Sequence, residues 1–148
     1  MRFMLQVKLR EDSDPDPDFY YDQQFRVYHE PYLIWERDIW ETVLSACSVY
    51  LIEAEGNHAG DVILENRGGR GTYIVDLSVL PEYQGKGVGK AVLKRIKGMA
   101  KRVTAVTRKE TLHFFLKSGF VLQRTMKSYY DPGIDGYYIV FSRKESVS

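Results

Sequence analysis

The sequence is poor in the residues that build covalent cross-links and metal sites. Its 148 residues include a single cysteine, Cys47, which excludes an internal disulfide and a zinc site built on cysteines. Its three histidines, at positions 29, 58 and 113, are too scattered to form a metal-ligand spacing. We therefore expect no bound metal, and we interpret Cys47 as an ordinary buried thiol on an apolar helical face.

Long apolar runs and an excess of one charge are also missing. No run approaches the length of a membrane span, and the N-terminus lacks the apolar segment of a secretory signal. The formal net charge of +1 creates no overall field that would attract nucleic acid or a membrane surface. We expect a cytoplasmic protein without such partners, either a monomer or a homodimer. A hydrophobic content of 44% is enough for a single domain spanning residues 1–148.

The most informative stretch is a glycine-rich segment between a predicted strand and a predicted helix: Gln84, Gly85, Lys86, Gly87, Val88 and Gly89, followed by Lys90. The start of a helix presents backbone N–H groups without acceptors, and the helix dipole adds positive potential there. Such a point binds phosphate. The question is then which phosphate-bearing ligand the segment takes.

Two common phosphate loops do not fit this segment. A nucleoside-triphosphate loop needs an early glycine where this chain has Gln84, and a hydroxyl side chain where it has Ala91. A dinucleotide loop needs a third glycine where this chain has Lys90. A third type, Gln-x-x-Gly-x-Gly, is matched by Gln84, Gly87 and Gly89 and holds the pyrophosphate of coenzyme A. The alternative is a glycine-rich turn that binds no ligand.

The segments on either side of this loop add to the match. Residues 77–83 read Leu-Ser-Val-Leu-Pro-Glu-Tyr, and residues 114–120 read Phe-Phe-Leu-Lys-Ser-Gly-Phe. Together with the loop they resemble the GNAT superfamily of N-acetyltransferases, over roughly residues 48–142. The resemblance implies acetyl-CoA as co-substrate. It also implies coenzyme contacts from the loop 84–90 and from five flanking positions: Leu77, Val79, Leu80, Arg108 and Phe115. The last two replace an Asn and a Tyr of many relatives.

Hydrophobic periodicity gives the order of the elements. We predict strands over 2–9, 48–54, 60–65, 73–80, 103–106, 121–127 and 137–142. We predict three helices. The first spans 32–47, the second follows the glycine loop, and the third runs from a capping box at Thr107–Glu110 to Gly119. The acidic segment 11–18 is interpreted as a solvated loop, and residues 129–136 as another. The fold class is α+β. By resemblance it is the GNAT fold, a mostly antiparallel twisted sheet of about seven strands flanked by about four helices.

Acetyl transfer needs a donor for the oxyanion and an acceptor for the amine proton. In GNAT relatives the donor is a backbone N–H near the strand end, which would be Val79 or Leu80 here. Many relatives carry a Glu at the position of Tyr73, and Phe115 cannot donate a proton. Tyr73 is therefore the first candidate for moving the amine proton, through water, and Asp76 is the second. Either side chain could instead be purely structural.

The absence of an obvious strong base favours a weakly basic acceptor. At neutral pH an α-amine with a pKa of about 7.7–8.0 is neutral far more often than a lysine amine with a pKa of about 10.4. In addition, Tyr129 and Tyr130 lie in a segment that resembles the substrate-contacting segment of protein N-terminal acetyltransferases, and Pro31 and Tyr32 could form a substrate wall. We predict a protein or peptide α-amine as acceptor. The alternatives are a small-molecule amine, a lysine side chain, or a coenzyme-A-binding regulator without catalysis.

Overall fold

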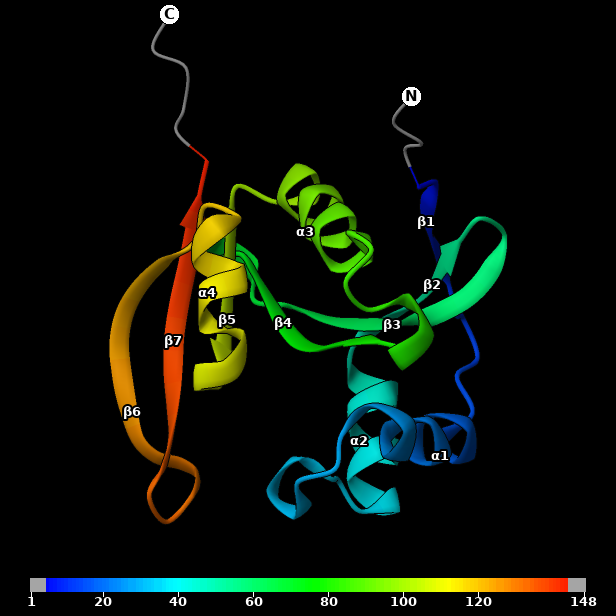
Figure 1. Ribbon diagram of the computed structural model, residues 1–148, viewed down its shortest axis with the longest axis horizontal. Coiled ribbons are helices and arrows are strands. Elements are labelled where there is room, and N and C mark those ends of the chain that lie inside the picture. Colours follow the sequence, from blue (N-terminus) through cyan, green and yellow to red (C-terminus); the bar gives the residue numbers. More distant parts are fainter. Residues whose placement is uncertain (1–4, 144–148) are drawn as a thin grey trace, which may run out of the picture. The chain divides into compact units, whose positions relative to one another are not determined.

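The computed structural model describes residues 5–143, which form one seven-stranded mixed sheet with four α-helices. The strands lie in the order β1-β2-β3-β4-β5-β7-β6 (Figure 1). The β4–β5 pair is parallel, and the β1–β2, β2–β3, β5–β7 and β6–β7 pairs are antiparallel. The predicted α+β class and the mostly antiparallel sheet are confirmed.

In chain order the elements are β1 (Val7–Glu11), α1 (Pro17–Val27), α2 (Arg37–Ala46), β2 (Ser48–Ala54), β3 (Asn57–Asn66), β4 (Thr72–Val79), α3 (Val88–Met99), β5 (Arg102–Thr107), α4 (Lys109–Lys117), β6 (Val121–Asp131) and β7 (Ile134–Ser142). Residues 2–4 of the first predicted strand lie outside the described residues.

These elements pack as two compact units. The first contains the residues up to Glu65 together with Val75–Val92, and the second contains Asn66–Ile74 together with the residues from Leu93 onward. The expectation of a single domain over residues 1–148 stays a prediction.

The core of the first unit lies between its two N-terminal helices and the sheet. Figure 1 shows α1 and α2 on the same face of β2 and β3. The buried side chains of this core are Tyr20, Trp40, Leu44, Val49 and Ile63. The rings of Tyr20 and Trp40 stack with centroids 6.0 Å apart. Because aromatic rings bury large apolar areas, this pair contributes to the packing of α1 against α2.

The helix α1 is missing from the sequence prediction, which placed a solvated loop over 11–18. Asp16 is the N-cap residue of α1, and its side chain accepts a hydrogen bond from the Asp18 N–H at 3.0 Å. Pro17 occupies the first helical position, where a missing N–H costs nothing. The acidic, proline-containing segment 11–18 thus includes the start of α1. The helix predicted over 32–47 begins only at Arg37.

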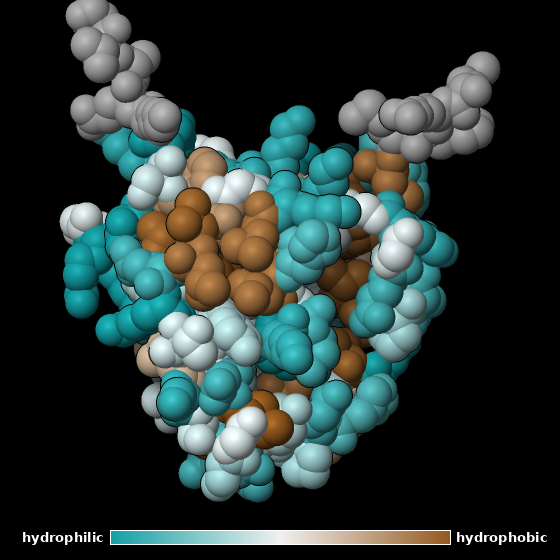
Figure 2. Space-filling view, turned by 60° about the vertical axis from the view of Figure 1, so that its left-hand side comes forward, coloured by the Kyte–Doolittle hydropathy of each residue, from teal (hydrophilic) through white to brown (hydrophobic). Residues whose placement is uncertain are grey.

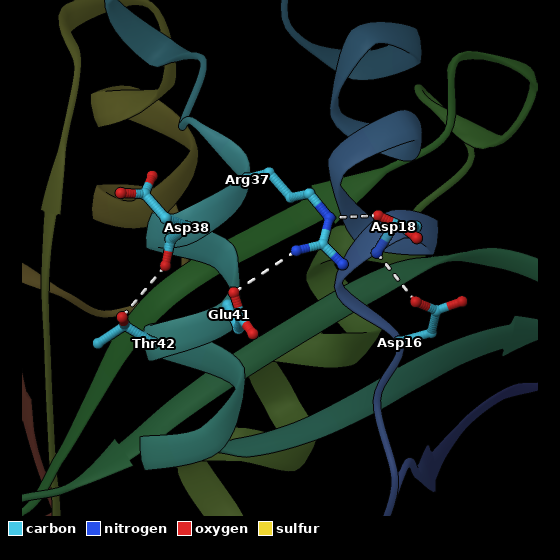
Figure 3. A network of polar contacts seen from close by, with 6 residues as sticks. All are labelled: Asp16, Asp18, Arg37, Asp38, Glu41 and Thr42. Carbon is cyan, nitrogen blue, oxygen red and sulfur yellow. Dashed lines mark hydrogen bonds and ion pairs between the residues drawn. The ribbon is translucent and has the colours of Figure 1, made fainter.

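An exposed polar network joins α1 to α2 (Figure 3). The Arg37 guanidinium pairs with the Asp18 carboxylate on α1 and, at 3.5 Å, with Glu41 one turn further along α2. All three side chains are about half exposed or more, and such surface pairs each contribute about 0–1 kcal/mol. The apolar core therefore dominates the helix–helix contact.

The second unit has an aromatic core beneath α4. The ring of Phe115 packs edge-on against Phe114 at 5.2 Å and against Phe120 at 5.4 Å between centroids. The Lys97 ammonium, from the C-terminal half of α3, donates to the Ser118 carbonyl at 2.6 Å. This bond satisfies one of the carbonyls that the end of α4 leaves without an intrahelical donor.

The start of α4 differs from the prediction, whereas its end agrees. The helix begins at Lys109, and its N-cap residue Arg108 makes no side-chain capping bond. The capping box proposed for Thr107 and Glu110 is therefore wrong. The Thr107 hydroxyl instead pairs with the Thr111 hydroxyl at 2.5 Å. Gly119 follows the helix at a φ of 93°, a left-handed conformation that favours glycine.

The hairpin of β6 and β7 is longer than predicted. The β6 strand extends to Asp131 and β7 begins at Ile134, so much of the segment 129–136 belongs to the strands. Within the described residues β6 is an edge strand of the sheet, because it stands last in the strand order. Figure 2 shows an apolar area on one face of the molecule, surrounded by hydrophilic residues. Exposed apolar side chains of the second unit include Leu116, Val121 and Leu122.

Two strands of the first unit approach each other so closely that only glycine fits between them. A Cβ atom at Gly60 would lie 1.9 Å from the Ser78 carbonyl oxygen, and the φ of Gly60 is 151°. We predict that Gly60→Ala destabilises the fold by about 3 kcal/mol or more, because the obstacle is backbone and cannot rotate away. Urea unfolding measures the change.

The matched control is Gly98→Ala on α3. A Cβ atom there meets nothing within 4 Å. In a helix, replacing glycine by alanine stabilises the folded protein by about 0.5–1 kcal/mol, because alanine has the higher helix propensity. Equal unfolding free energies for the two variants would contradict the β3–β4 contact.

Candidate functional site

The end of β4 is held by two hydrogen bonds within the first unit. The Leu80 N–H donates to the Ala59 carbonyl at 2.8 Å. The Gln84 side-chain amide reaches back and donates to the Val79 carbonyl at 2.8 Å. Of the two predicted oxyanion donors, the Leu80 N–H is thus already engaged, which favours Val79. Leu77 and Val79 are half-buried, and Leu80 is buried.

The glycine loop has the backbone geometry of an anion-binding helix start. Gly85 and Gly87 have φ values of 74° and 83°, in the left-handed region, with nothing within 4 Å of a Cβ atom built at either position. The first backbone bond of α3 runs from the Ala91 N–H to the Gly87 carbonyl at 3.1 Å. Helix geometry therefore leaves the N–H groups of Val88, Gly89 and Lys90 without intrahelical acceptors.

Positive charge surrounds these amides. The side chains of Lys86 and Lys90 are exposed, and the Lys86 ammonium lies 5.9 Å from the centroid of the Tyr83 ring. Val88 is buried and anchors the first turn of α3. Free amides, the helix dipole and the lysines together suit a diphosphate.

A second constellation in the first unit consists of two buried carboxyl groups, Asp61 on β3 and Asp76 on β4. Asp61 is only 2% exposed, and one of its oxygens accepts a bond from the Gln23 amide. Asp76 accepts bonds from the Tyr28 hydroxyl at 2.9 Å and from the Ser78 hydroxyl at 3.0 Å. The second oxygen of Asp61 is buried and has no donor within the described part of the chain. The two carboxyl groups contact each other.

Burial dominates the electrostatics of this pair. Burial, and then the negative charge of Asp76, raise the pKa of Asp61 well above its usual range. Burial also raises the pKa of Asp76, although its bonds with Asp61, Tyr28 and Ser78 lower it. The same cause, followed by the charge of Asp76, raises the pKa of Tyr28. All three groups therefore favour their neutral forms more than they would in water.

The sequence indicated Asp76 but gave no reason to choose Asp61, Gln23 or Tyr28. The one signal in the sequence is that Asp61 directly precedes the apolar run 62–64, where a charge is out of place. Along β4 the side chains of Asp76 and Ser78, two positions apart, lie together and are hydrogen-bonded.

In the second unit the structure brings three of the predicted residues together. The hydroxyl groups of Tyr73 and Tyr129 are hydrogen-bonded, and burial, followed by Tyr129, raises the pKa of Tyr73. The rings of Tyr129 and Tyr130 meet edge-on at 4.9 Å, and the Tyr130 hydroxyl donates to the Val106 carbonyl at 3.2 Å. The Arg67 guanidinium lies 3.8 Å above the Tyr73 ring. Tyr129 remains 46% exposed, so the cluster is open to a ligand.

The other predicted residues are placed as follows. Pro31 is exposed and Tyr32 half-buried, in a short 3-10 helix over Pro31–Leu33 of the first unit. Arg108 and Phe115 belong to the second unit, at the N-cap and inside α4. Phe115 is 7% exposed and forms part of the aromatic core, so its ring is largely committed to packing.

Two absences concern residues 5–143. No three His, Cys, Asp or Glu side chains in this range gather closely enough to hold a metal ion. None of the helices in the same range has the length and apolar character needed to cross a membrane.

Comparison with known proteins identifies the family. Residues 45–122 match the family described as "Acetyltransferase (GNAT) domain", and this match covers more than half of the chain. The chain belongs to the GNAT acetyltransferases. No curated protein sequence matches it significantly.

Solved structures show the same fold. The ribosomal-protein-S18-alanine N-acetyltransferase of Escherichia coli is 14% identical, with 97% of each chain covered and a TM-score of 0.76. Arabidopsis thaliana Naa50, solved with the bisubstrate analogue CoA-Ac-MVNAL, is 20% identical over 92% of this chain and 98% of its own, with a TM-score of 0.71. The spermidine N-acetyltransferase of Vibrio cholerae is 16% identical over 93% and 94%, also with a TM-score of 0.71.

The family match gives the class of reaction. The protein is an acetyl-CoA-dependent N-acetyltransferase, and acetyl-CoA is its co-substrate. The glycine loop before α3 fits the diphosphate of that molecule, because its amides lack intrahelical acceptors and its glycines admit close approach.

The buried carboxyl pair makes stability depend on pH. An Asp in an unfolded chain has a pKa of about 3.9, and the folded pKa of Asp61 is higher. Its contribution to stability is therefore fully present below about pH 4 and is lost as pH rises through the folded pKa. We predict that in Asp61→Asn the free energy of unfolding falls less steeply as pH rises, because the amide side chain does not ionise.

Urea unfolding of both proteins between about pH 4 and pH 8 measures the two slopes. The control is Asp22→Asn, at an exposed position of α1, which should leave the slope of the unaltered protein. Parallel curves for Asp61→Asn and the unaltered protein would show that Asp61 is ionised throughout.

Proposed function

We propose that the protein transfers the acetyl group of acetyl-CoA to the α-amine of a protein or peptide N-terminus. The observation that carries this proposal is the convergence of Tyr73, Tyr129 and Tyr130 in the second unit. A peptide N-terminus presents backbone N–H and C=O groups, and neutral phenols can both donate to and accept from such groups. The exposed ring of Tyr129 adds apolar surface for the first side chain.

The tyrosine cluster also contains the guanidinium of Arg67, which lies over the Tyr73 ring. The similar structures include both an N-terminal acetyltransferase with a peptide-bearing analogue and a spermidine acetyltransferase, so the fold alone does not choose between them.

The chemistry proceeds by direct attack. The amine nitrogen forms a bond to the thioester carbon, and the C–S bond breaks as the thiolate leaves. The Val79 N–H is the proposed donor to the oxyanion. Because its pKa is raised, the Tyr73 phenol stays protonated and serves as a hydrogen-bond donor that orients the acceptor. This leaves Asp76 as the proposed acceptor of the amine proton, which reverses the order that the sequence suggested.

Four further residues belong to the proposal. Pro31 and Tyr32 are proposed to contact the acceptor, and Arg108 and Phe115 are proposed to contact the coenzyme. We also propose that both units belong to one acetyltransferase domain, since one strand order runs through them. The protein acts in the cytoplasm as a monomer or a homodimer.

The acceptor class is tested by steady-state release of coenzyme A thiol with a panel of amines. We expect turnover with peptides that have a free α-amine, and little with an N-terminally blocked, lysine-containing peptide or with spermidine. An α-amine is neutral in about 10–20% of molecules at neutral pH, and a lysine amine in about 0.04%. The Tyr129→Ala, Tyr130→Ala double variant should raise the KM for peptide at least about tenfold, by loss of buried contact.

The control variant is Val121→Ala, on the same strand and 66% exposed. It should leave the KM for peptide unchanged. Faster turnover of spermidine than of any peptide would refute the α-amine proposal. Binding of acetyl-CoA without thiol release from any amine would indicate a coenzyme-binding regulator instead.

A further inference from the structure

The charges of this chain are divided unequally between its two units. The described part of the second unit, residues 66–74 and 93–143, contains 13 Lys and Arg side chains but only 3 carboxylates, an excess of ten positive charges. The total of +1 arises because the first unit is correspondingly acidic. The expectation of no membrane or nucleic-acid partner was based on that total. A binding surface responds instead to the charge within a Debye length of about 8–10 Å.

Several of these cations lie at one end of the second unit, where β4 and β5 begin and β7 ends. A Cβ atom at Gly71, just before β4, would lie 2.2 Å from the Arg102 carbonyl oxygen. The Arg143 N–H donates to the Lys101 carbonyl at 2.8 Å, and the Arg143 guanidinium donates to the Ala100 carbonyl at 3.1 Å. We call this region the basic end, and its six cations are Arg70, Lys97, Lys101, Arg102, Lys117 and Arg143.

The C-terminal end of α4 belongs to the basic end as well. The Lys97 ammonium donates to the Ser118 carbonyl at 2.6 Å and lies 5.3 Å from the centroid of the Phe141 ring, near the end of β7. The Phe120 ring, just after α4, lies 5.8 Å from the Phe141 ring between centroids. The ends of α3, α4 and β7 therefore meet in one place.

The carboxylates of the described second unit lie elsewhere. Glu110 is in the first turn of α4, at the opposite end of that helix from Lys117. Asp131 is the last residue of β6 and Asp135 the second of β7, beside the turn of that hairpin. Lys117 is exposed and forms no ion pair with any residue of the range 5–143. The positive charge of the basic end is thus not neutralised by carboxylates of its own unit.

Exposed apolar side chains lie beside these cations. Helix α4 ends in a tight turn in which the Gly119 N–H donates to the Leu116 carbonyl at 3.2 Å, and β6 begins two residues later. Val121 is 66% exposed, and Leu116 and Leu122 are exposed as well. We call these three side chains the apolar tip. With Lys117 between them in the chain, they form a surface that is both apolar and basic.

This combination decides between possible partners. A nucleic acid offers phosphates to the cations but no apolar phase to the tip. Its bases stack on exposed aromatic rings, whereas Phe120 is buried and Phe141 half-buried. A second copy presenting the same end would bring two positive surfaces together. A bilayer with anionic lipids offers negative head groups and, directly beneath them, acyl chains. Of these three partners, the bilayer matches both the charge and the apolar tip.

We propose that the basic end docks on an anionic lipid bilayer. The apolar tip enters between the head groups, and the cations of the basic end face the lipid phosphates. Attachment of this kind is peripheral and reversible, because a few side chains bury far less apolar area than a spanning helix. This inference goes beyond acetyl transfer and does not depend on which amine is the acceptor.

Docking is measured by co-sedimentation of the full chain with two kinds of vesicle, phosphatidylcholine alone and phosphatidylcholine mixed with phosphatidylserine. We expect binding to the mixed vesicles only. Raising the salt from about 0.1 M to about 1 M should weaken it at least about tenfold, because the Debye length falls from about 10 Å to about 3 Å. Equal binding to both kinds of vesicle, or binding to neither, would overturn the proposal.

The place of docking is tested by reversing one charge. Lys117→Glu should lower the partition coefficient on the mixed vesicles about tenfold or more, since each cation near an anionic bilayer strengthens binding about fivefold and the new carboxylate is repelled. The matched control is Lys109→Glu, which makes the same change of net charge at the other, exposed end of α4. It should leave the coefficient within about twofold. Equal weakening by both variants would refute the basic end as the contact.

The apolar tip is tested by the Val121→Ser, Leu122→Ser double variant. It should weaken binding to the mixed vesicles about tenfold or more, by loss of buried apolar area. The control is Ile39→Ser on α2, an exposed aliphatic position of the first unit, which should bind as the unaltered protein does. Unchanged binding of the double variant would show that no side chain of the tip enters the bilayer.

Two further measurements separate the possible failures. Thermal unfolding confirms that each variant is folded, and thiol release with a soluble peptide should be unchanged in Lys117→Glu and in the double variant. Loss of docking is thus recognised separately from loss of acetyl transfer. Fluorescence anisotropy with a labelled single-stranded RNA provides the last comparison. Tighter binding of this RNA than of the mixed vesicles, with the double variant unaffected, would identify the surface as a nucleic-acid site and overturn the proposal.

Discussion

A helix that begins directly after two left-handed glycines cannot satisfy its own first N–H groups. Gly85 and Gly87 bring the chain out of the end of β4 and into α3 within a few residues. The first intrahelical bond then starts at Ala91, so the preceding amides need an external acceptor. We propose that a diphosphate supplies that acceptor, and its negative charge also suits the positive end of the helix dipole. In this proposal the start of α3 fixes where the acyl carrier is held.

The second constraint is the burial of charge beneath the same strand. Asp61 and Asp76 lie between β3, β4 and the end of α1, with hydroxyl and amide groups as partners and no cation. A buried group of this kind holds its proton more tightly than one in water, which suits the role of proton acceptor that we propose for Asp76. Tyr73, by contrast, has its hydroxyl bonded to Tyr129 and suits recognition better than proton transfer. Both residues that we propose for these roles belong to β4, three positions apart.

Sequence reasoning was strongest where local rules act. It predicted the glycine loop, the β4 strand and the end of α4 at Gly119. These features depend on backbone conformation and apolar periodicity, which can be seen within a short stretch of sequence. It failed on α1, because an acidic and proline-rich segment was interpreted as a loop although Asp16 and Pro17 form a regular helix start. It also failed on the capping box at Thr107, whose hydroxyl found a partner in Thr111.

The candidate site was predictable only in part for the same reason. Tyr73, Tyr129 and Tyr130 could be chosen by resemblance, and the structure brings them together. Asp61 and Tyr28 could not be chosen from the sequence. Tyr28 was found only because its hydroxyl bonds with Asp76, 48 positions further along the chain. Asp61 was found only because one of its buried oxygens lacks a donor in the described part of the chain. Such long-range pairing of polar groups leaves no periodic trace in the sequence.

The central claim is that main-chain amides at the start of α3 hold the diphosphate of the acyl carrier. Its most direct test is a nuclear magnetic resonance titration of the backbone amides with coenzyme A and, separately, with pantetheine, which lacks the diphosphate. The account predicts large shifts for residues 85–90 with coenzyme A, much smaller shifts with pantetheine, and none with either ligand in a Gly87→Val variant. Unchanged amide signals in this segment at saturating coenzyme A would contradict it.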